Sequence, residues 1–296
     1  MPEPTPLAPP STASPSTTPA SQNPPSTAST STTSPSTTAV STTVRAHDGL
    51  RLAGTLLTPR AEPEHAVLLL HGEGATREQD GFFTLLSGEL AAEGVASLRF
   101  DLPGHGESEG RQEDLSLSLL LNVISSGLDH LREHVGATRL TLVATGLTGG
   151  VAAGYAARRG DEVSRLVLFN PLIDYKEHFV DARPTWSRDY LDESAGRELL
   201  ATGRLPYTPS FVLGRALLNE VFWLQPQGVL DVIAAPTLIV HGAGPSAVSV
   251  ESSRAADKAL TCDHRLVELD AEQGGAWHAP AAEAAVAWIL GEGVSP

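Results

Sequence analysis

The chain has 296 residues, a formal net charge of −15 and 41% hydrophobic residues. This length suits one large domain or two small ones, and the apolar content is that of an ordinary globular protein. The negative charge repels nucleic-acid phosphates and anionic lipid headgroups, so we expect neither as a partner. The single cysteine, Cys262, cannot close an internal disulfide and has no nucleophile motif around it.

Residues 1–43 consist almost wholly of Ser, Thr, Pro and Ala. They show no hydrophobic periodicity, so we predict a disordered tail that could dock a partner enzyme. A mucin-like stalk has the same composition but requires secretion, and the first ten residues carry neither the basic nor the apolar region of a secretory signal. Apolar runs elsewhere are too short to span a bilayer. The sequence therefore predicts a cytoplasmic protein without membrane contact.

From Val44 to the C-terminus the sequence alternates between strand-like and helix-like segments. The first segment, VRAHDGLRLAGTLLTP, reads as two antiparallel strands about the Asp48 and Gly49 turn. Six short apolar runs follow, each ending in polar residues or glycine, as strands covered on both faces do. These runs are 66–72, 95–101, 139–145, 165–171, 236–242 and 264–270.

Helix-like stretches separate the apolar runs, at 81–92, 115–135, 151–159, 250–260 and 281–290. Alternation of strands and helices with short loops predicts an α/β fold with a doubly wound, mostly parallel, eight-stranded sheet. The interval 172–230 breaks the rhythm, because it is long, aromatic and charged. We predict that it forms a helical cap insertion over the C-terminal edge of the sheet, where such folds bind their ligands. The folded domain is then 44–296.

Five motifs, in this order, resemble the α/β-hydrolase fold family, in particular the cinnamoyl/feruloyl-esterase and serine-aminopeptidase-like members. The motifs are HGEG (71–74), RFDLPGHGESEG (99–110), TLVATGLTGG (141–150), LVLFNP (166–171) and PTLIVHG (236–242). The resemblance runs from Val44 to the C-terminus. It implies an α/β-hydrolase fold with a nucleophilic serine on a sharp strand-to-helix turn and an aspartate and a histidine later in the chain.

The resemblance assigns the nucleophile position to Gly146. Counting from the strand LTLV places the elbow on 144–148, and Tyr155 then lies at the familiar distance inside the helix. A competing register, anchored on the two glycines at 149–150, assigns Leu147 instead. Neither residue has a hydroxyl or a thiol, so neither can form an acyl-enzyme. The sequence thus predicts that the serine is absent in either register.

The other two triad positions also differ from the family. The aspartate position aligns with Pro245, which cannot ionise or orient an imidazole, and the histidine position aligns with Gly274. His278 follows a few residues later. A shortened loop could carry His278 into the vacated position as a displaced catalyst, or His278 could simply begin the last helix. The resemblance therefore implies a degenerate triad.

The oxyanion hole of the family uses backbone amides, which survive the loss of the triad. The resemblance assigns these donors to Leu147 and Glu73. The Glu73 side chain is a tentative catalytic group, because a carboxyl on the floor of an apolar pocket tends to have a raised pKa and could carry a proton. The alternative is that Glu73 turns away and pairs with Arg77.

Four further residues are candidates for the pocket wall. Thr145 and Thr148 flank the elbow, and Tyr175 and Trp223 lie in the predicted cap. Because no second His or Cys lies at ligand spacing from the HGEG motif, we expect no metal site there. Neither G-x-G-x-x-G nor a phosphate-binding loop is present, so no nucleotide cofactor is indicated.

Three functional hypotheses remain open. The first is a non-hydrolytic enzyme that cyclises, eliminates from or isomerises an acyl-derived metabolite of the polyketide type, as in bacterial natural-product biosynthesis. Such chemistry requires a shaped cavity, an oxyanion site and a proton carrier, but no nucleophile. The second is a pseudo-hydrolase that binds a small ligand or a partner protein. The third is a hydrolase with a rewired site in which Glu73 or His278 activates water.

Overall fold

A computed structural model describes residues 37–242, 248–270 and 276–291. Most of the predicted tail, and the positions of Pro245 and Gly274, lie outside these ranges. The described residues all belong to one compact unit, residues 35–296.

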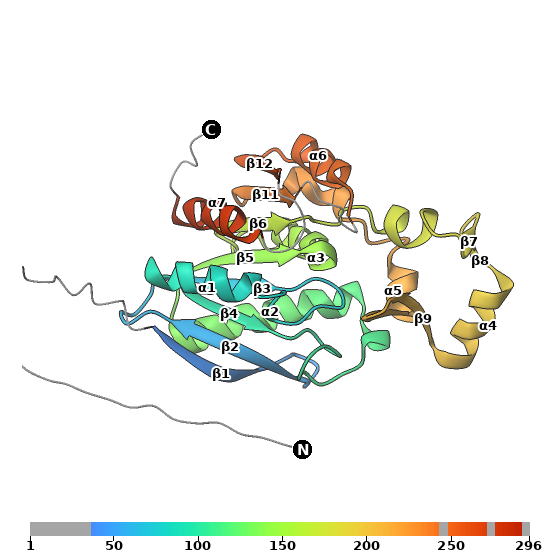
Figure 1. Ribbon diagram of the computed structural model, residues 1–296, viewed down its shortest axis with the longest axis horizontal. Coiled ribbons are helices and arrows are strands. Elements are labelled where there is room, and N and C mark those ends of the chain that lie inside the picture. Colours follow the sequence, from blue (N-terminus) through green and yellow to red (C-terminus); the bar gives the residue numbers. More distant parts are fainter. Residues whose placement is uncertain (1–36, 243–247, 271–275, 292–296) are drawn as a thin grey trace, which may run out of the picture. The chain divides into compact units, whose positions relative to one another are not determined.

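The predicted eight-stranded sheet is present, with strand order β1-β2-β4-β3-β5-β6-β11-β12 (Figure 1). Strands β1 and β2 are antiparallel, β2 is antiparallel to β4, and the remaining neighbours are parallel. The sheet is therefore mostly parallel and doubly wound, as predicted. Its strands are β1 Thr38–Arg45, β2 Arg51–Thr58, β3 His65–Leu70, β4 Ala96–Phe100, β5 Arg139–Thr145, β6 Arg165–Phe169, β11 Thr237–Gly242 and β12 His264–Leu269.

Helices cover both faces of this sheet. Along β3, Val67 and Leu69 join one apolar cluster, which also contains residues of α1 and α7. Leu68 and Leu70 join the other cluster, with residues of α2, α3 and α6. Because successive strand side chains point to opposite faces, a continuous apolar run is what a strand between two helical layers requires. The helices are α1 Phe82–Ala92, α2 Leu117–Val135, α3 Gly146–Arg158, α6 Val250–Ala259 and α7 His278–Leu290.

Helix α3 begins at Gly146, five residues before the predicted start at 151. The sequence-based prediction left Gly149 and Gly150 outside the helix. Instead, both glycines are buried in the first turns, where a Cβ on Gly149 would lie 3.0 Å from Pro171 and one on Gly150 would lie 2.5 Å from the Tyr175 hydroxyl. They permit close packing of the helix against the following segments, which outweighs their low helix propensity.

Strand β1 begins at Thr38, six residues before the predicted domain boundary at Val44. Residues 38–45 pair with β2 along their whole length, and the Thr42 hydroxyl contacts the His130 ring of α2 at 3.0 Å. Threonine and valine favour extended backbone, so this part of the Ser/Thr-rich segment can complete the sheet. The folded domain therefore extends further toward the N-terminus than the composition suggested.

The interval 172–230 forms a separate cap beside the C-terminal ends of the strands, at the right of Figure 1. It was predicted to be helical, but it also contains two small antiparallel sheets, β7–β8 and β9–β10. Its elements are η2 Glu177–Asp181, β7 Trp186–Ser187, β8 Tyr190–Leu191, α4 Glu193–Thr202, β9 Arg204–Thr208, β10 Phe211–Gly214, α5 Arg215–Glu220 and η3 Pro226–Val232. No helix among the described residues is long and apolar enough to cross a membrane.

Candidate functional site at the elbow

The HGEG loop follows β3 and is anchored by His71. This side chain is fully buried; its Nδ1 donates to the Gly72 carbonyl, and its Nε2 accepts from the Leu102 amide at 2.9 Å. Burial lowers the pKa of His71 to about 4, so the ring is neutral and Nε2 is free to accept. Nδ1 thus bonds within the HGEG loop and Nε2 joins this loop to the loop after β4, so neither nitrogen is left for catalysis.

The strand-to-helix turn lies at Gly146, between β5 and α3. Thr145 is extended, whereas Gly146 has φ +51°, in the left-handed region. Glycine adopts this conformation without the steric strain that a Cβ introduces. The turn directs the Leu147 amide toward the HGEG loop.

The Glu73 carboxylate occupies the predicted oxyanion hole. Its Oε2 accepts from the Leu147 amide at 2.9 Å, and the Glu73 amide also bonds to this carboxylate. The alternative pairing with Arg77 is wrong, because Arg77 bonds instead to Asp101 and Glu107. Both amides thus donate to the same carboxylate, so a side chain of the chain itself occupies the position predicted for a ligand oxygen.

The Glu73 carboxylate also fills the space of a side chain at the elbow. A Cβ on Gly146 would lie 2.7 Å from Glu73 Oε2, which is well inside van der Waals contact. The same Oε2 bonds to the amide of the residue that follows. Glu73 therefore brings an ionisable group to the point at which the turn itself carries none.

Burial raises the pKa of the Glu73 carboxyl, while the hydrogen bonds from the two amides lower it in part. The residue as a whole is half-buried, but its carboxyl lies in the closed turn, away from bulk water. Because a buried charge is costly in a low dielectric, the carboxyl takes up a proton more readily than one in water. A carboxyl with a raised pKa at a strand-to-helix turn has the properties of a proton carrier.

The two threonines of the elbow have structural roles. Thr148 is buried and its hydroxyl lies 2.8–3.1 Å from the carbonyls of Leu70, His71 and Thr145. Thr145 donates to Oε1 of Gln79 at 3.3 Å. Their hydroxyls are engaged with the protein, which does not support the prediction that they bind a ligand.

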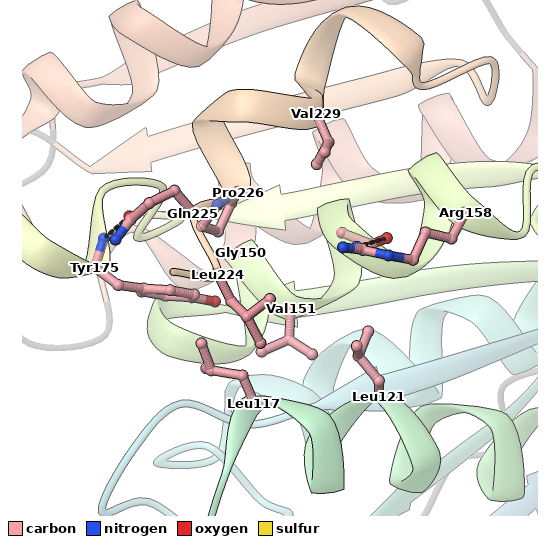
Figure 2. A pocket seen from close by; sticks show the side chains of 11 residues that line it. Leu117, Leu121, Gly150, Val151, Arg158, Tyr175, Leu224, Gln225, Pro226 and Val229 are labelled. Atoms are coloured by element: carbon pink, nitrogen blue, oxygen red, sulfur yellow. Dashed lines mark hydrogen bonds between the residues drawn. The ribbon is translucent and has the colours of Figure 1, made fainter. Parts of the chain in front are cut away.

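Tyr175 is fully buried and holds the elbow from the cap side. Its hydroxyl donates to the Leu147 carbonyl at 2.8 Å, and burial, together with the Glu73 charge, raises its pKa well above the usual value. Figure 2 shows the ring beside Gly150 and Val151 in a small apolar cavity between α2, α3 and η3. That cavity measures about 40 Å³, so it has room for water but not for a metabolite.

Two other predicted residues lie elsewhere. Trp223 is 84% exposed, so the expectation that it lines a pocket is wrong; it follows α5 on the cap surface, while the adjacent Phe222 packs on Trp186. His278 is the first residue of α7, as the helix-start alternative predicted, and its ring packs against Phe82 and Trp277. These contacts give no support to a displaced catalyst.

Gln79, which no sequence motif indicated, holds the two halves of the site together. Its Oε1 accepts from the Gly72 amide at 2.9 Å as well as from Thr145. Gln79 and Asp80 both have positive φ, of 44° and 53°, a conformation that costs about 1–3 kcal/mol in a non-glycine residue. No local sequence signal marks such a position.

Sequence analysis also missed a polar cluster in the cap. The Tyr207 hydroxyl contacts both Arg183 and Nε2 of His178. Burial and the Arg183 charge lower the pKa of His178 to about 4, so this ring is a neutral acceptor. Residues 29 positions apart form the cluster, and only the folded cap brings them together. No group of three His, Cys, Asp or Glu residues that could hold a metal occurs in the described part of the chain.

Comparisons with known proteins agree with this architecture. Residues 61–198 match the serine aminopeptidase S33 family. Est1E from Butyrivibrio proteoclasticus, solved with ferulic acid, is 21% identical with a TM-score of 0.71, covering 85% of this chain and 98% of that one. A monoacylglycerol lipase from Paleococcus ferrophilus is 21% identical with a TM-score of 0.61, covering 82% and 99%. The chain is an α/β-hydrolase-fold protein.

A curated relative matches with lower coverage. The dihydrolipoyllysine-residue acetyltransferase component of an acetoin cleaving system from Cupriavidus necator is 24% identical over 199 residues. The match spans 67% of this chain but only 49% of that protein. It adds support for the fold and does not transfer the activity of the longer protein.

Proposed function

We propose that this chain is a non-hydrolytic enzyme that moves a proton on an acyl-derived substrate, with the Glu73 carboxyl as the proton carrier. The reaction class is cyclisation, elimination or isomerisation, as in the biosynthesis of polyketide-type metabolites. One observation carries the proposal: the Glu73 carboxylate, with its raised pKa, lies at the elbow beside Gly146 and the Leu147 amide.

The first step of the argument is the missing nucleophile. Glycine at position 146 cannot attack a carbonyl, so the acyl-enzyme route of a serine hydrolase is closed. By resemblance, Pro245 and Gly274 stand at the positions of the acid and the histidine, and neither residue ionises. Hydrolysis through a Ser-His-Asp triad is therefore not part of the proposal.

The second step is what the remaining groups can do. A carboxylate that turns from the Leu147 amide onto a substrate would abstract a proton next to a carbonyl. The same movement would free the amides of Leu147 and Glu73 to stabilise the enolate oxygen that develops. One motion thus supplies both the base and the oxyanion donors. Of the proteins similar to this chain, one is a complex with ferulic acid and another is a monoacylglycerol lipase, which favours a carbonyl compound as substrate.

The second candidate function is a binding protein without catalysis. It is favoured by the hydrogen bonds from both oxyanion amides to Glu73, because these amides are then not available to polarise a substrate carbonyl. The partner would be a small ligand or, through the N-terminal residues, another protein.

A cytoplasmic location likewise remains a prediction.

Hydrogen–deuterium exchange tests the proton-transfer proposal without knowledge of the product. Acyl thioesters and aryl ketones with acidic α-protons are incubated with the protein in D₂O, and deuterium incorporation is followed by mass spectrometry. We expect catalysed exchange by the wild type, and a loss of about 10²–10⁴-fold in Glu73→Gln, which keeps an acceptor for the Leu147 amide but cannot take a proton.

Glu64→Gln, which removes an exposed carboxyl at the start of β3, serves as the matched control and should exchange at the wild-type rate. Equal exchange by Glu73→Gln and wild type would remove Glu73 from the mechanism. Tight binding of a probe without any exchange would favour the binding protein.

A further inference from the structure

The cap contains a cavity of its own, apart from the small one beside Tyr175. Its volume is about 360 Å³, within the range of about 300–1,000 Å³ typical of small-molecule sites. Apolar side chains from η2, β7, β9, β10 and α5 form most of the wall. They are Phe179, Trp186, Leu205, Leu213 and Leu218. Such a wall suits the apolar body of a ligand.

Two charged residues also line the cavity, Arg183 and Glu198. Glu198 is exposed on α4, where water screens its charge. Arg183 is half-buried and lies 4.3 Å above the Tyr207 ring. Its Nε donates to the His178 carbonyl and a terminal nitrogen donates to the Tyr207 hydroxyl. The stacking and these bonds fix the orientation of the guanidinium.

Arg183 contacts no carboxylate within the described ranges. The nearby acids Asp181 and Asp189 are both paired with Lys176 instead. A guanidinium has five N–H donors and matches the two oxygens of a carboxylate. An oriented arginine without an acidic partner, at the wall of an apolar cavity, is complementary to an organic anion.

We propose that the cap cavity binds an organic carboxylate with an apolar body, and that Arg183 holds the carboxylate while Tyr207 keeps the guanidinium in place. The inference deepens the proposed function, since it names the substrate class. It depends on the proposed function in one respect only, namely that the end of the ligand away from Arg183 reacts at Glu73.

The β9–β10 hairpin connects the cavity to the elbow. Tyr207 on β9 lines the cavity, while Ser210 and Phe211 pack on the HGEG loop, where a Cβ on Gly74 would lie 2.5 Å from Ser210 Oγ. Burial raises the pKa of Tyr207 to about 12, with Arg183 lowering it and Glu73 raising it. Glu73 is therefore within electrostatic reach of Tyr207, which lines the cavity.

Two probes of equal shape separate charge recognition from apolar burial: 2-naphthoate and 2-naphthamide. Binding of each to the full chain is measured by isothermal titration calorimetry. We expect naphthoate to bind the wild type about 10- to 100-fold more tightly than naphthamide, as a charge-assisted hydrogen bond to an oriented guanidinium implies. Arg183→Gln should abolish this preference, so that the two probes bind equally.

Arg197→Gln is the matched control, because it removes a cap arginine of α4 that is exposed and does not line the cavity. It should retain the wild-type preference. Ala195→Leu adds bulk to a buried wall position and should weaken both probes, which locates them in the cavity; its circular dichroism and melting temperature report whether the cap is still folded.

No naphthoate binding by the wild type, equal affinity for acid and amide, or an unchanged preference in Arg183→Gln would each overturn the proposal. Binding is measured without turnover, so this result is independent of the exchange experiment on Glu73. Naphthoate that binds through Arg183 to a protein without exchange activity would support the cap site and reject the proposed reaction.

Discussion

Glu73 and Gly146 share one volume: the carboxylate of Glu73 lies 2.7 Å from the point at which a Cβ on Gly146 would stand. The two residues are 73 positions apart, yet each restricts what the other can be. A side chain at the elbow would displace the carboxylate from the Leu147 amide, and the glycine that leaves room for it can carry no nucleophile. The acidic HGEG loop and the glycine elbow thus form a matched pair.

This relationship predicts a measurable coupling between the two positions. Gly146→Ala combines the strain of a left-handed residue, ~1–2 kcal/mol, with loss of the Glu73 hydrogen bond to the Leu147 amide, ~1 kcal/mol or more for a charged acceptor. Gly136→Ala reports the backbone strain alone, because Gly136 has φ +71° and no atom within 4 Å of its Cβ position.

The coupling is tested by urea denaturation of the single variants Gly146→Ala, Gly136→Ala and Glu73→Ala and of the double variant Gly146→Ala with Glu73→Ala. We expect Gly146→Ala to destabilise more than Gly136→Ala, and the difference to disappear when Glu73 is already alanine. Strict additivity of the two changes would show that the carboxylate does not occupy the elbow in solution.

A serine placed at the elbow should not produce an esterase. In Gly146→Ser the hydroxyl would meet the Glu73 carboxylate, and the ring nitrogens of His71 and His105 nearby are already bonded. A serine without a histidine to take its proton gains little over water, because the members of a triad act as a unit. We expect neither the wild type nor this variant to hydrolyse short p-nitrophenyl esters above background or to react with a fluorophosphonate probe. Rapid ester turnover by Gly146→Ser would show that Glu73, or a group outside the described residues, can take the proton of the new hydroxyl.

Removal of the Glu73 charge should stabilise the protein in a pH-dependent way. The folded pKa of Glu73 is raised above 4.5, so the folded state holds this proton to a higher pH than the unfolded state does. The wild type therefore loses stability as pH rises from about 4.5 through the folded pKa. Glutamine does not titrate and avoids this loss.

Thermal melts at pH 4 and pH 7 check this expectation. Glu73→Gln should melt near the wild-type temperature at pH 4 and above it at pH 7, whereas Glu64→Gln at an exposed position should match the wild type at both. A lower melting temperature for Glu73→Gln at pH 7 would mean that the amide bonds outweigh the burial of the charge. A Glu73→Gln variant that loses activity but gains stability would fit the trade-off between stability and activity that is common at catalytic groups.

Nested N-terminal truncations should distinguish the tail from the first strand. Deletion of residues 1–36 should leave the melting temperature nearly unchanged, because a segment of this composition buries little apolar surface. Deletion of residues 1–45 removes β1, including the fully buried Val44, and leaves β2 with an unpaired edge. We expect the second deletion to lower the melting temperature by several degrees. A drop of that size with the shorter deletion would show that residues before 37 pack on the domain.

The sequence by itself determined the mostly parallel sheet, the positions of its buried strands along the chain and the absence of a hydroxyl or thiol at the elbow. These features follow from local patterns, because a strand covered on both faces reads as a continuous apolar run and a residue's chemistry is visible without its neighbours. The predicted starts of the helix at Gly146 and of the first strand at Thr38 were wrong. Prediction from sequence relies on the local propensity of residues such as glycine and threonine, and here tertiary contacts override that propensity.

Only the tertiary structure decided where the side chains of the site point. In the sequence, Glu73 was equally compatible with a proton carrier on the pocket floor and with an ion pair to Arg77. In the structure Arg77 pairs with Asp101 and Glu107, and the Glu73 carboxylate accepts from the Leu147 amide instead. The contacts of Arg183 with Tyr207 likewise arise from cap elements far apart along the chain. Hydrogen-bond partners across such separations are set by packing, and packing leaves no local signature in the sequence.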